Sequence, residues 1–243
     1  MISAFFHTVF YNPIYNALVA LVALVPGSDV GIAVILLTIV IRIILLPFSL
    51  AAARTQRAMK VLEPKIKALK ETHKGDKEKE ALETLALYKE AEVNPFASLL
   101  MAFIQIPILL ALYWVFYYEP FPAINLTRLY ALTPVPQTAS LEFLGLISVA
   151  SKSVLLAALA GITQFVQAHM ALSGTMKPSG SGMQNDFQKV IGMQLKYVFP
   201  FLIATISYTT SGAVALYFIA TNIAGSVQEW HMRRVLEREE QAA

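Results

Sequence analysis

Long apolar stretches alternate with polar connections along the chain. Five stretches are long enough to cross the roughly 30 Å hydrocarbon layer as helices, at about 1.5 Å of rise per residue; they are 30–51, 95–117, 145–170, 190–209 and 212–231. A shorter stretch, 13–25, is followed by Pro26, Gly27 and Asp29. We therefore interpret 1–29 as an extracytoplasmic N-terminus with an interfacial helix on the outer face, with a sixth span as the alternative.

The segment 52–94 is charged and follows a helical period. Apolar residues recur at three- or four-residue spacing in each half of it, at Met59, Leu62, Ile66 and Leu69 and then at Ala81, Leu85 and Tyr88. The residues from His73 to Asp76 are typical of a turn. This pattern predicts an antiparallel helical hairpin, in which Pro64 should kink or break the first helix. The hairpin is either a mobile lid or a spacer between spans.

The composition narrows the class of protein. Hydrophobic residues make up 56% of the 243 residues and charged residues only 14%, whereas about a quarter of a soluble domain is charged. The fold class that we predict is therefore an all-α polytopic membrane protein with five transmembrane helices. The net charge of +3 is not accompanied by any nucleic-acid motif, so we expect no specific nucleic-acid binding.

The positive charges gather in the connections that we assign to one side of the membrane. The 52–94 segment holds ten of the nineteen Lys and Arg residues, and the loop 171–189 and the tail 232–243 hold five more. The loop 118–144 holds only Arg128. Positive charge is retained on the cytoplasmic side. We expect a multi-pass protein of the plasma membrane, with its N-terminus outside and its C-terminus in the cytoplasm.

Several kinds of chemistry are excluded by what the sequence lacks. It contains no cysteine, which rules out disulfides, thiolate metal sites and a cysteine nucleophile. The four histidines are scattered without metal-ligand spacing. Neither a zinc-protease motif, a hydrolase nucleophile motif nor a phosphate-binding glycine loop is found. We expect no catalytic activity, no cofactor and no metal site.

One charged residue lies in the middle of an apolar stretch. Arg42 is the midpoint of 31–53, and Thr38 lies one turn before it on the same helix face. An arginine at this depth costs at least ~2.5–3.5 kcal/mol, and no Asp or Glu lies in the core of a span to pair with it. We expect Arg42 to face a water-filled cavity; the alternative is that it binds backbone carbonyls at a packed interface. The glutamines of the spans, Gln105, Gln164 and Gln167, line the cavity or link helices.

Five motifs, in order, carry a resemblance. They are ILLTIVIRIILLPFS, LEPKIKALKE, LYKEAEVNPF with FIQIPILLALYW, GITQFVQ, and SGAVALYFIATNIAGSVQEW. This order over residues 13–236 resembles the YidC/Oxa1/Alb3 family of membrane protein insertases. The resemblance implies a five-helix core with a polar groove, open to the cytoplasm and to lipid and closed on the outside.

The resemblance also implies roles for individual residues. Arg42 matches the groove arginine of the family, Thr38 a polar residue one turn before it, and Gln167 a groove glutamine. Tyr217 and Phe218 match an aromatic pair that contacts substrates, although Phe218 lacks the polar tip found in many relatives. With the other polar residues of the spans, the predicted substrate-binding groove comprises Arg42, Thr38, Gln105, Gln167, Tyr217, Phe218 and Asn222.

The function that follows is insertion of membrane proteins, with Arg42 attracting acidic client segments. Its partners would be nascent membrane protein clients and membrane lipid, with the Sec translocon and the ribosome as further candidates. The short tail after Arg238 lacks a long basic extension, so we expect no autonomous ribosome tether. The competing hypotheses are a small-solute or ion transporter with Arg42 as an anion site and a structural scaffold. A transporter usually shows inverted repeats, and none is visible.

Overall fold

The computed structural model describes residues 2–73, 75–91, 97–119, 121–173 and 192–242. They are mostly helical, with two short strands, which confirms the predicted all-α class. The chain divides into two compact units, one formed by Met1–Ile44 and Ile106–His231 and the other by Leu45–Gln105 and Met232–Ala243. Each unit is described by itself below.

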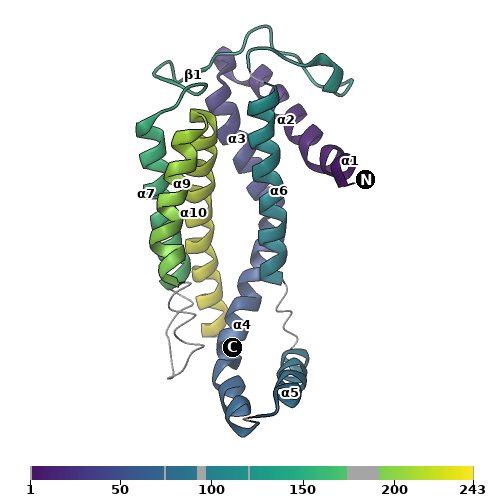
Figure 1. Ribbon diagram of the computed structural model, residues 1–243, viewed down its shortest axis with the longest axis vertical. Helices are drawn as coiled ribbons and strands as arrows, with labels where there is room; N and C mark the ends of the chain where they lie inside the picture. The colour runs from purple at the N-terminus through teal and green to yellow at the C-terminus, as the bar shows by residue number, and fades with distance from the viewer. Residues whose placement is uncertain (1, 74, 92–96, 120, 174–191, 243) are drawn as a thin grey trace. The chain divides into compact units, whose positions relative to one another are not determined.

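The first unit contains most of the helices, shown in Figure 1. In chain order these are α1 (Ile2–Phe6), a π-helical turn η1 (His7–Tyr11), α2 (Asn12–Leu24), the 3-10 turn η2 (Pro26–Ser28), α3 (Val30–Ile44), the second half of α6 (Ala97–Tyr118), the 3-10 turn η3 (Leu126–Arg128), α7 (Val154–Ser173), the π-helical turn η4 (Gln194–Val198), α9 (Phe199–Thr209) and most of α10 (Gly212–Ala242). Most of the predicted loop 171–189 lies outside the described residues.

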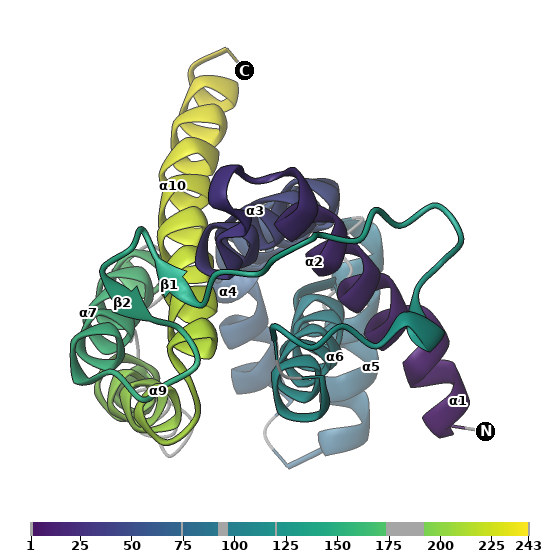
Figure 2. The ribbon, with the colours of Figure 1, turned by 90° about the horizontal axis from the view of Figure 1, so that it is seen from above.

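The N-terminal helices are longer than the sequence pattern suggested. Because α1, η1 and α2 follow one another without a break, the helical run Ala4–Leu24 has 21 residues and is long and apolar enough to cross a membrane. The argument that 13–25 is too short to span is therefore wrong. Viewed along α7 and α9, α1 and α2 extend sideways (Figure 2). The interfacial position of 13–25 and the sixth span both stay open as predictions.

Span length can be judged only for the described helices. Among them Ala4–Leu24 and Val154–Leu172 satisfy the length and apolarity of a membrane span, and α3 with the start of α4 (Leu46–Thr72) would make a third if together they form one broken span. The break between α3 and α4 falls at Leu45, two residues before Pro47. Proline cannot donate a backbone hydrogen bond and clashes with the preceding turn. The predicted continuous helix over 30–51 is therefore interrupted.

The second unit contains the predicted hairpin, formed by α4 and α5 (Lys77–Glu90), which pack against each other. The turn between them is closed by a contact of 2.7 Å between His73 Nε2 and Glu83 Oε2 and by Asp76, whose side chain accepts from the N–H of Lys79. Of the predicted kink or break at Pro64, the break is not found, because α4 continues through Pro64 to Thr72. Pro64 is exposed, so water can hydrate the carbonyl that lacks its helical partner.

The apolar stripe of the hairpin is only partly as predicted. On α4, Leu62 is buried, as the spacing suggested. On α5, however, Ala81 and Leu85 are exposed; of the three predicted positions Tyr88 alone is half-buried, next to half-buried Leu87. Among the described residues of α5 none is buried, so α5 has little hydrophobic contact to hold it.

A short β-hairpin delays the start of α7. Strands β1 (Glu142–Phe143) and β2 (Ile147–Ser148) pair antiparallel, and the turn between them places Leu144 and Gly145 at positive φ. The helix predicted from residue 145 therefore begins only at Val154. From there α7 packs closely along α9, where a Cβ added at Gly161 would lie 3.0 Å from the Cβ of Ala204. Such close approach through small residues is a common way for membrane helices to pack.

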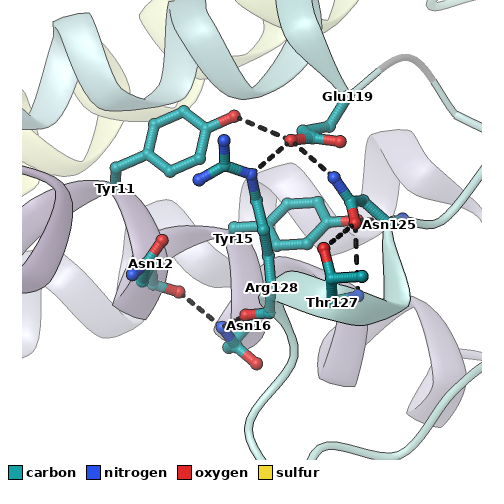
Figure 3. A network of polar contacts seen from close by, with 8 residues as sticks. All are labelled: Tyr11, Asn12, Tyr15, Asn16, Glu119, Asn125, Thr127 and Arg128. Atoms are coloured by element: carbon teal, nitrogen blue, oxygen red, sulfur yellow. Dashed lines mark hydrogen bonds and ion pairs between the residues drawn. The ribbon is translucent and has the colours of Figure 1, made fainter.

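The long connection after α6 is tied to α2 by a polar network (Figure 3). Glu119, at the end of α6, is buried and forms an ion pair with Arg128 Nε at 2.8 Å. The same carboxylate accepts hydrogen bonds from Tyr11 and Asn125. The Arg128 guanidinium lies 5.2 Å from the centre of the Tyr11 ring, a cation–π contact.

A second group of contacts holds the same connection further along. Asn16 of α2 accepts hydrogen bonds from the N–H of Tyr130 and the hydroxyl of Thr133, each at 2.7 Å. Asp29 caps α3 by accepting from the N–H of Ile32 and also accepts from the N–H of Leu144 at 2.7 Å. The connection is thus fixed to α2 at Asn16 and to the start of α3 at Asp29.

Candidate functional site

The last turn of α3 carries Arg42, a half-buried residue in an otherwise apolar helix. Its Nη2 atom donates a hydrogen bond to the backbone carbonyl oxygen of Thr221 in α10, at 3.1 Å. None of the ion pairs found in the described parts of the chain involves Arg42. A carbonyl dipole orients a guanidinium but does not neutralise it. The site therefore retains its positive charge.

A third helix, α7, also reaches Arg42, next to Gly225 of α10. A Cβ added at Gly225 would lie 2.3 Å from Nε2 of Gln167, on α7, and 3.4 Å from Nη2 of Arg42. The amide and the guanidinium thus approach the same patch of α10 backbone. Arg42 and Gln167, two residues that the resemblance assigned to one groove, lie close together.

The face of α10 towards Arg42 follows a four-residue spacing. Tyr217, Thr221 and Gly225 are separated by four residues each and therefore share one helix face. All three are buried. The hydroxyl of Thr221 is a buried polar atom without a hydrogen-bond partner among the described residues. A buried hydroxyl is usually paired with protein or water. The Thr221 hydroxyl can therefore still form a hydrogen bond at this face of α10.

Thr38 contributes less than the sequence suggested. It is one turn from Arg42, but it is only 3% exposed, and its hydroxyl donates to the carbonyl oxygen of Val34 in its own helix at 2.8 Å. Back-bonding of this kind satisfies the threonine hydroxyl within α3. The structure therefore places Thr38 beside the site with its donor already used.

Phe218 and Asn222 lie on a neighbouring face of α10. The amide of Asn222, only 1% exposed, donates to the carbonyl oxygen of Ala160 at 3.3 Å and to the hydroxyl of Thr163 at 3.2 Å, both on α7. This is a link between helices. The ring of Phe218 is buried, with its centroid 5.6 Å from that of Tyr217. Asn222 thus fixes α10 against α7, whereas the ring contact of Phe218 lies within α10.

Gln105 belongs to the second unit, where it lies half-buried in α6. Of the predicted site residues, the first unit thus brings together Arg42, Gln167 and Tyr217. Thr38 bonds its own helix, Asn222 links α10 to α7, and Phe218 is buried beside Tyr217. Sequence reasoning missed Thr221 and Gly225. The four-residue spacing from Tyr217 was the signal that could have found them.

Metal chemistry has no evident place here. In the described ranges, no group of three or more histidine, cysteine or acidic side chains is arranged to hold a metal ion. The groups gathered around Arg42 are a guanidinium, an amide, hydroxyls and backbone carbonyls. Such a set can bind water or an anionic group and orient it.

Known proteins resemble this chain over most of its length. A family model described as 60Kd inner membrane protein matches residues 21–240. A protein of Clostridium tetani (strain Massachusetts / E88) named membrane protein insertase YidC is 28% identical, over 82% of this chain and 79% of that protein. Two proteins of the same name, from Francisella philomiragia subsp. philomiragia and Francisella tularensis subsp. novicida, are each 30% identical over 84% of this chain and 32% of their own length. This chain thus spans about a third of the length of the two Francisella proteins. Because the family model matches nearly all of it, the chain belongs to the 60Kd inner membrane protein family (YidC/Oxa1).

Proposed function

We propose that the chain is a membrane protein insertase and chaperone of the inner membrane. It would pass hydrophobic client segments into the bilayer through a polar groove that opens to the cytoplasm and to lipid. The names of the relatives support insertion as the activity. The convergence of α3, α7 and α10 at Arg42, Gln167 and the Tyr217–Thr221 face supports the place of the groove.

The observation that carries the proposal is the uncompensated charge of Arg42. Its recorded partner is a backbone carbonyl, in a helix whose other side chains are apolar except for Thr38. A charge kept at this depth costs at least ~2.5–3.5 kcal/mol. Such a cost is expected where the charge has a function. Water and the polar groups of the site would keep the guanidinium charged.

The mechanism uses this charge only transiently. The polar end of a client must cross an apolar layer, and a wet groove reaching towards the middle of the membrane shortens the dry distance. At an effective dielectric constant of ~20, a charge pair 4 Å apart gains about 4 kcal/mol. This attraction recruits an acidic client segment without trapping it. The client's own hydrophobic span then moves into lipid, and its burial drives release.

Other parts of the chain have roles within the same proposal. The α4–α5 hairpin would lie on the cytoplasmic side and act as a lid that receives clients, with the N-terminus outside and the C-terminus inside. The weak burial of α5 supports a unit that can move on its attachments. Nascent membrane proteins and lipid are the proposed partners, and the Sec translocon and the ribosome are further candidates.

Reconstitution tests the proposal. The purified chain, placed in liposomes, is given a short single-span client with an acidic terminus. We predict that Arg42→Ala loses most of the insertion and that Arg42→Lys retains much of it, because the role depends on positive charge in water. Losing an attraction of about 4 kcal/mol would allow a decrease of up to roughly 1,000-fold.

Two controls make the result specific. Lys152→Ala removes an exposed cation outside the helices and should insert the client normally. A client with asparagine in place of its acidic residues should depend little on Arg42. Normal insertion of the acidic client by Arg42→Ala would reject the charge hypothesis, leaving the scaffold. Uptake of a small anion without client insertion would favour the transporter.

A further inference from the structure

The connection between α6 and β1 exposes large apolar side chains. Within 121–141, Leu132 is 96% exposed, and the other large apolar residues that are exposed are Leu126, Tyr130 and Val135. Figure 1 shows this segment beyond the ends of α6 and α7, with little regular structure. Exposed leucines occur singly on any protein surface. Four large apolar side chains in one irregular segment require an explanation.

The same segment presents almost no charge. Arg128 is the one ionisable lysine, arginine or acidic residue in 121–141. Its charge is compensated by the buried carboxylate of Glu119 at 2.8 Å and by the face of Tyr11. A loop of this length in bulk water would normally carry several charges, because about a quarter of the residues in soluble domains are charged. The composition does not suit a fully hydrated loop.

The exposure is built into the fold. The N–H of Asn125 donates to the hydroxyl of Tyr15 at 2.8 Å, and Tyr130 and Thr133 are both bonded to Asn16. These bonds hold the backbone of the segment against α2 on both sides of Leu126. The apolar side chains are therefore held outward by bonds to a neighbouring helix.

The last residues of α6 indicate the depth in the membrane at which segment 121–141 begins. Tyr117 and Tyr118, the last residues of the helix, are both exposed. Tyrosine is enriched where a membrane helix leaves the hydrocarbon, because its ring suits the acyl boundary and its hydroxyl suits the headgroups. The segment starts three residues later, so it begins at the interface between membrane and water.

We propose that segment 121–141 is an interfacial anchor, with Leu126, Tyr130, Leu132 and Val135 lying at the boundary between lipid headgroups and acyl chains. The partner is the lipid surface itself. A protein partner would be expected to meet one apolar patch with a polar, charged rim, whereas these side chains are spread along an uncharged segment. The proposal rests on membrane location only and is independent of the insertase activity.

Site-directed spin labelling tests the anchor. Leu132→Cys is suited to labelling because the side chain is almost fully exposed and the chain has no other cysteine. The full chain is placed in nanodiscs of phosphatidylethanolamine and phosphatidylglycerol, and collisions of the label with oxygen and with a water-soluble nickel chelate are compared. Ile162→Cys, exposed on apolar α7, and Glu78→Cys, exposed on charged α5, provide the lipid and water references.

The expected result is that the label at Leu132 prefers oxygen over the chelate by a ratio between the two references and closer to that of Ile162. A ratio equal to that of Glu78 would overturn the proposal, because it would place the segment in water. A label that meets the chelate in nanodiscs but is shielded from both reagents in native membranes would also overturn it, in favour of a protein partner. An insertion assay on the same variant shows separately whether activity depends on this segment.

Discussion

At the scale of single residues, Gly225 leaves the space on α10 that the Gln167 amide and the Arg42 guanidinium approach. We predict that Gly225→Ala displaces the Gln167 side chain, because the new Cβ would lie 2.3 Å from its Nε2 atom. That atom is the free end of a flexible side chain, so the helices need not separate. Loss of one polar interaction of about 1 kcal/mol should lower the rate of client insertion by roughly five-fold.

A double-mutant cycle decides whether the effect passes through Gln167. Insertion is measured for Gly225→Ala, Gln167→Ala and the double variant, with thermal unfolding in detergent as the control for folding. If the alanine acts by moving the glutamine, the double variant behaves like Gln167→Ala alone. Additive losses would mean that Gly225→Ala disturbs the packing of α10 itself, contrary to the prediction.

The sequence predicted some of these residues better than others, for a physical reason. Arg42 stands out because a charge in an apolar stretch is costly wherever it points. The bond from Arg42 to a backbone carbonyl agrees with one of the two alternatives, and the water-filled cavity stays a prediction. Thr38 and Asn222 were harder to assign, because a hydroxyl or an amide can equally bond its own helix or a neighbouring one. Only the packing of α3, α7 and α10 decides between these uses.

At the scale of elements, the ion pair of Glu119 and Arg128 joins α6 to the connection that follows it. We predict that Arg128→Met destabilises the fold by about 2 kcal/mol, between the ~0–1 kcal/mol of exposed pairs and the ~3–5 kcal/mol of fully buried ones. The intermediate value applies because the Glu119 side chain is 8% exposed and that of Arg128 is 39% exposed. The free energy of unfolding in mixed detergent measures the effect.

Substitution of Glu119, the other partner of this ion pair, tests whether the pair stabilises the fold through its charges. In Arg128→Met the carboxylate of Glu119 is left buried with its charge uncompensated, and Glu119→Gln removes that charge. The double variant should therefore recover part of the lost stability. Lys152→Met, which removes an exposed cation, should leave the unfolding free energy unchanged within about 0.5 kcal/mol. A double variant less stable than Arg128→Met alone would show that the pair does not act through charge.

The elements themselves were largely predictable, but their ends were not. Hydrophobic segments of 20 residues mark helices reliably because they must satisfy their backbone groups internally. Pro47 and Pro64 illustrate why the ends of helices could not be predicted. Pro47 follows the break at Leu45, whereas Pro64 is accommodated within α4, although both prolines are exposed. Proline removes the same hydrogen bond in both places, and the outcome depends on surroundings that the sequence alone does not describe. The β-hairpin before α7 was missed for a similar reason, because two-residue strands leave almost no periodic pattern.

At the scale of the whole molecule, the proposed groove should be open on one side only. Cysteines introduced singly by Thr38→Cys and Gln167→Cys report on this directly, because the chain contains no other thiol. We predict that a membrane-impermeant thiol reagent labels Gln167→Cys from the cytoplasmic side alone. Thr38→Cys should react more slowly, since Thr38 is buried and lies one turn before Arg42 in α3.

Two reference cysteines, one expected on each side of the membrane, allow the labelling pattern to be interpreted. Glu78→Cys, on the exposed charged hairpin, should label from the cytoplasmic side, and Lys152→Cys, an exposed position just before α7, should label from the other side if the N-terminus lies outside. Vesicles of both orientations are compared at equal protein. Labelling of Gln167→Cys from the side that labels Lys152→Cys would contradict a groove closed on the outside and would favour a path through the membrane. No labelling from either side would mean that Arg42 lies at a dry, packed interface, where its bond to the Thr221 carbonyl would be its whole role.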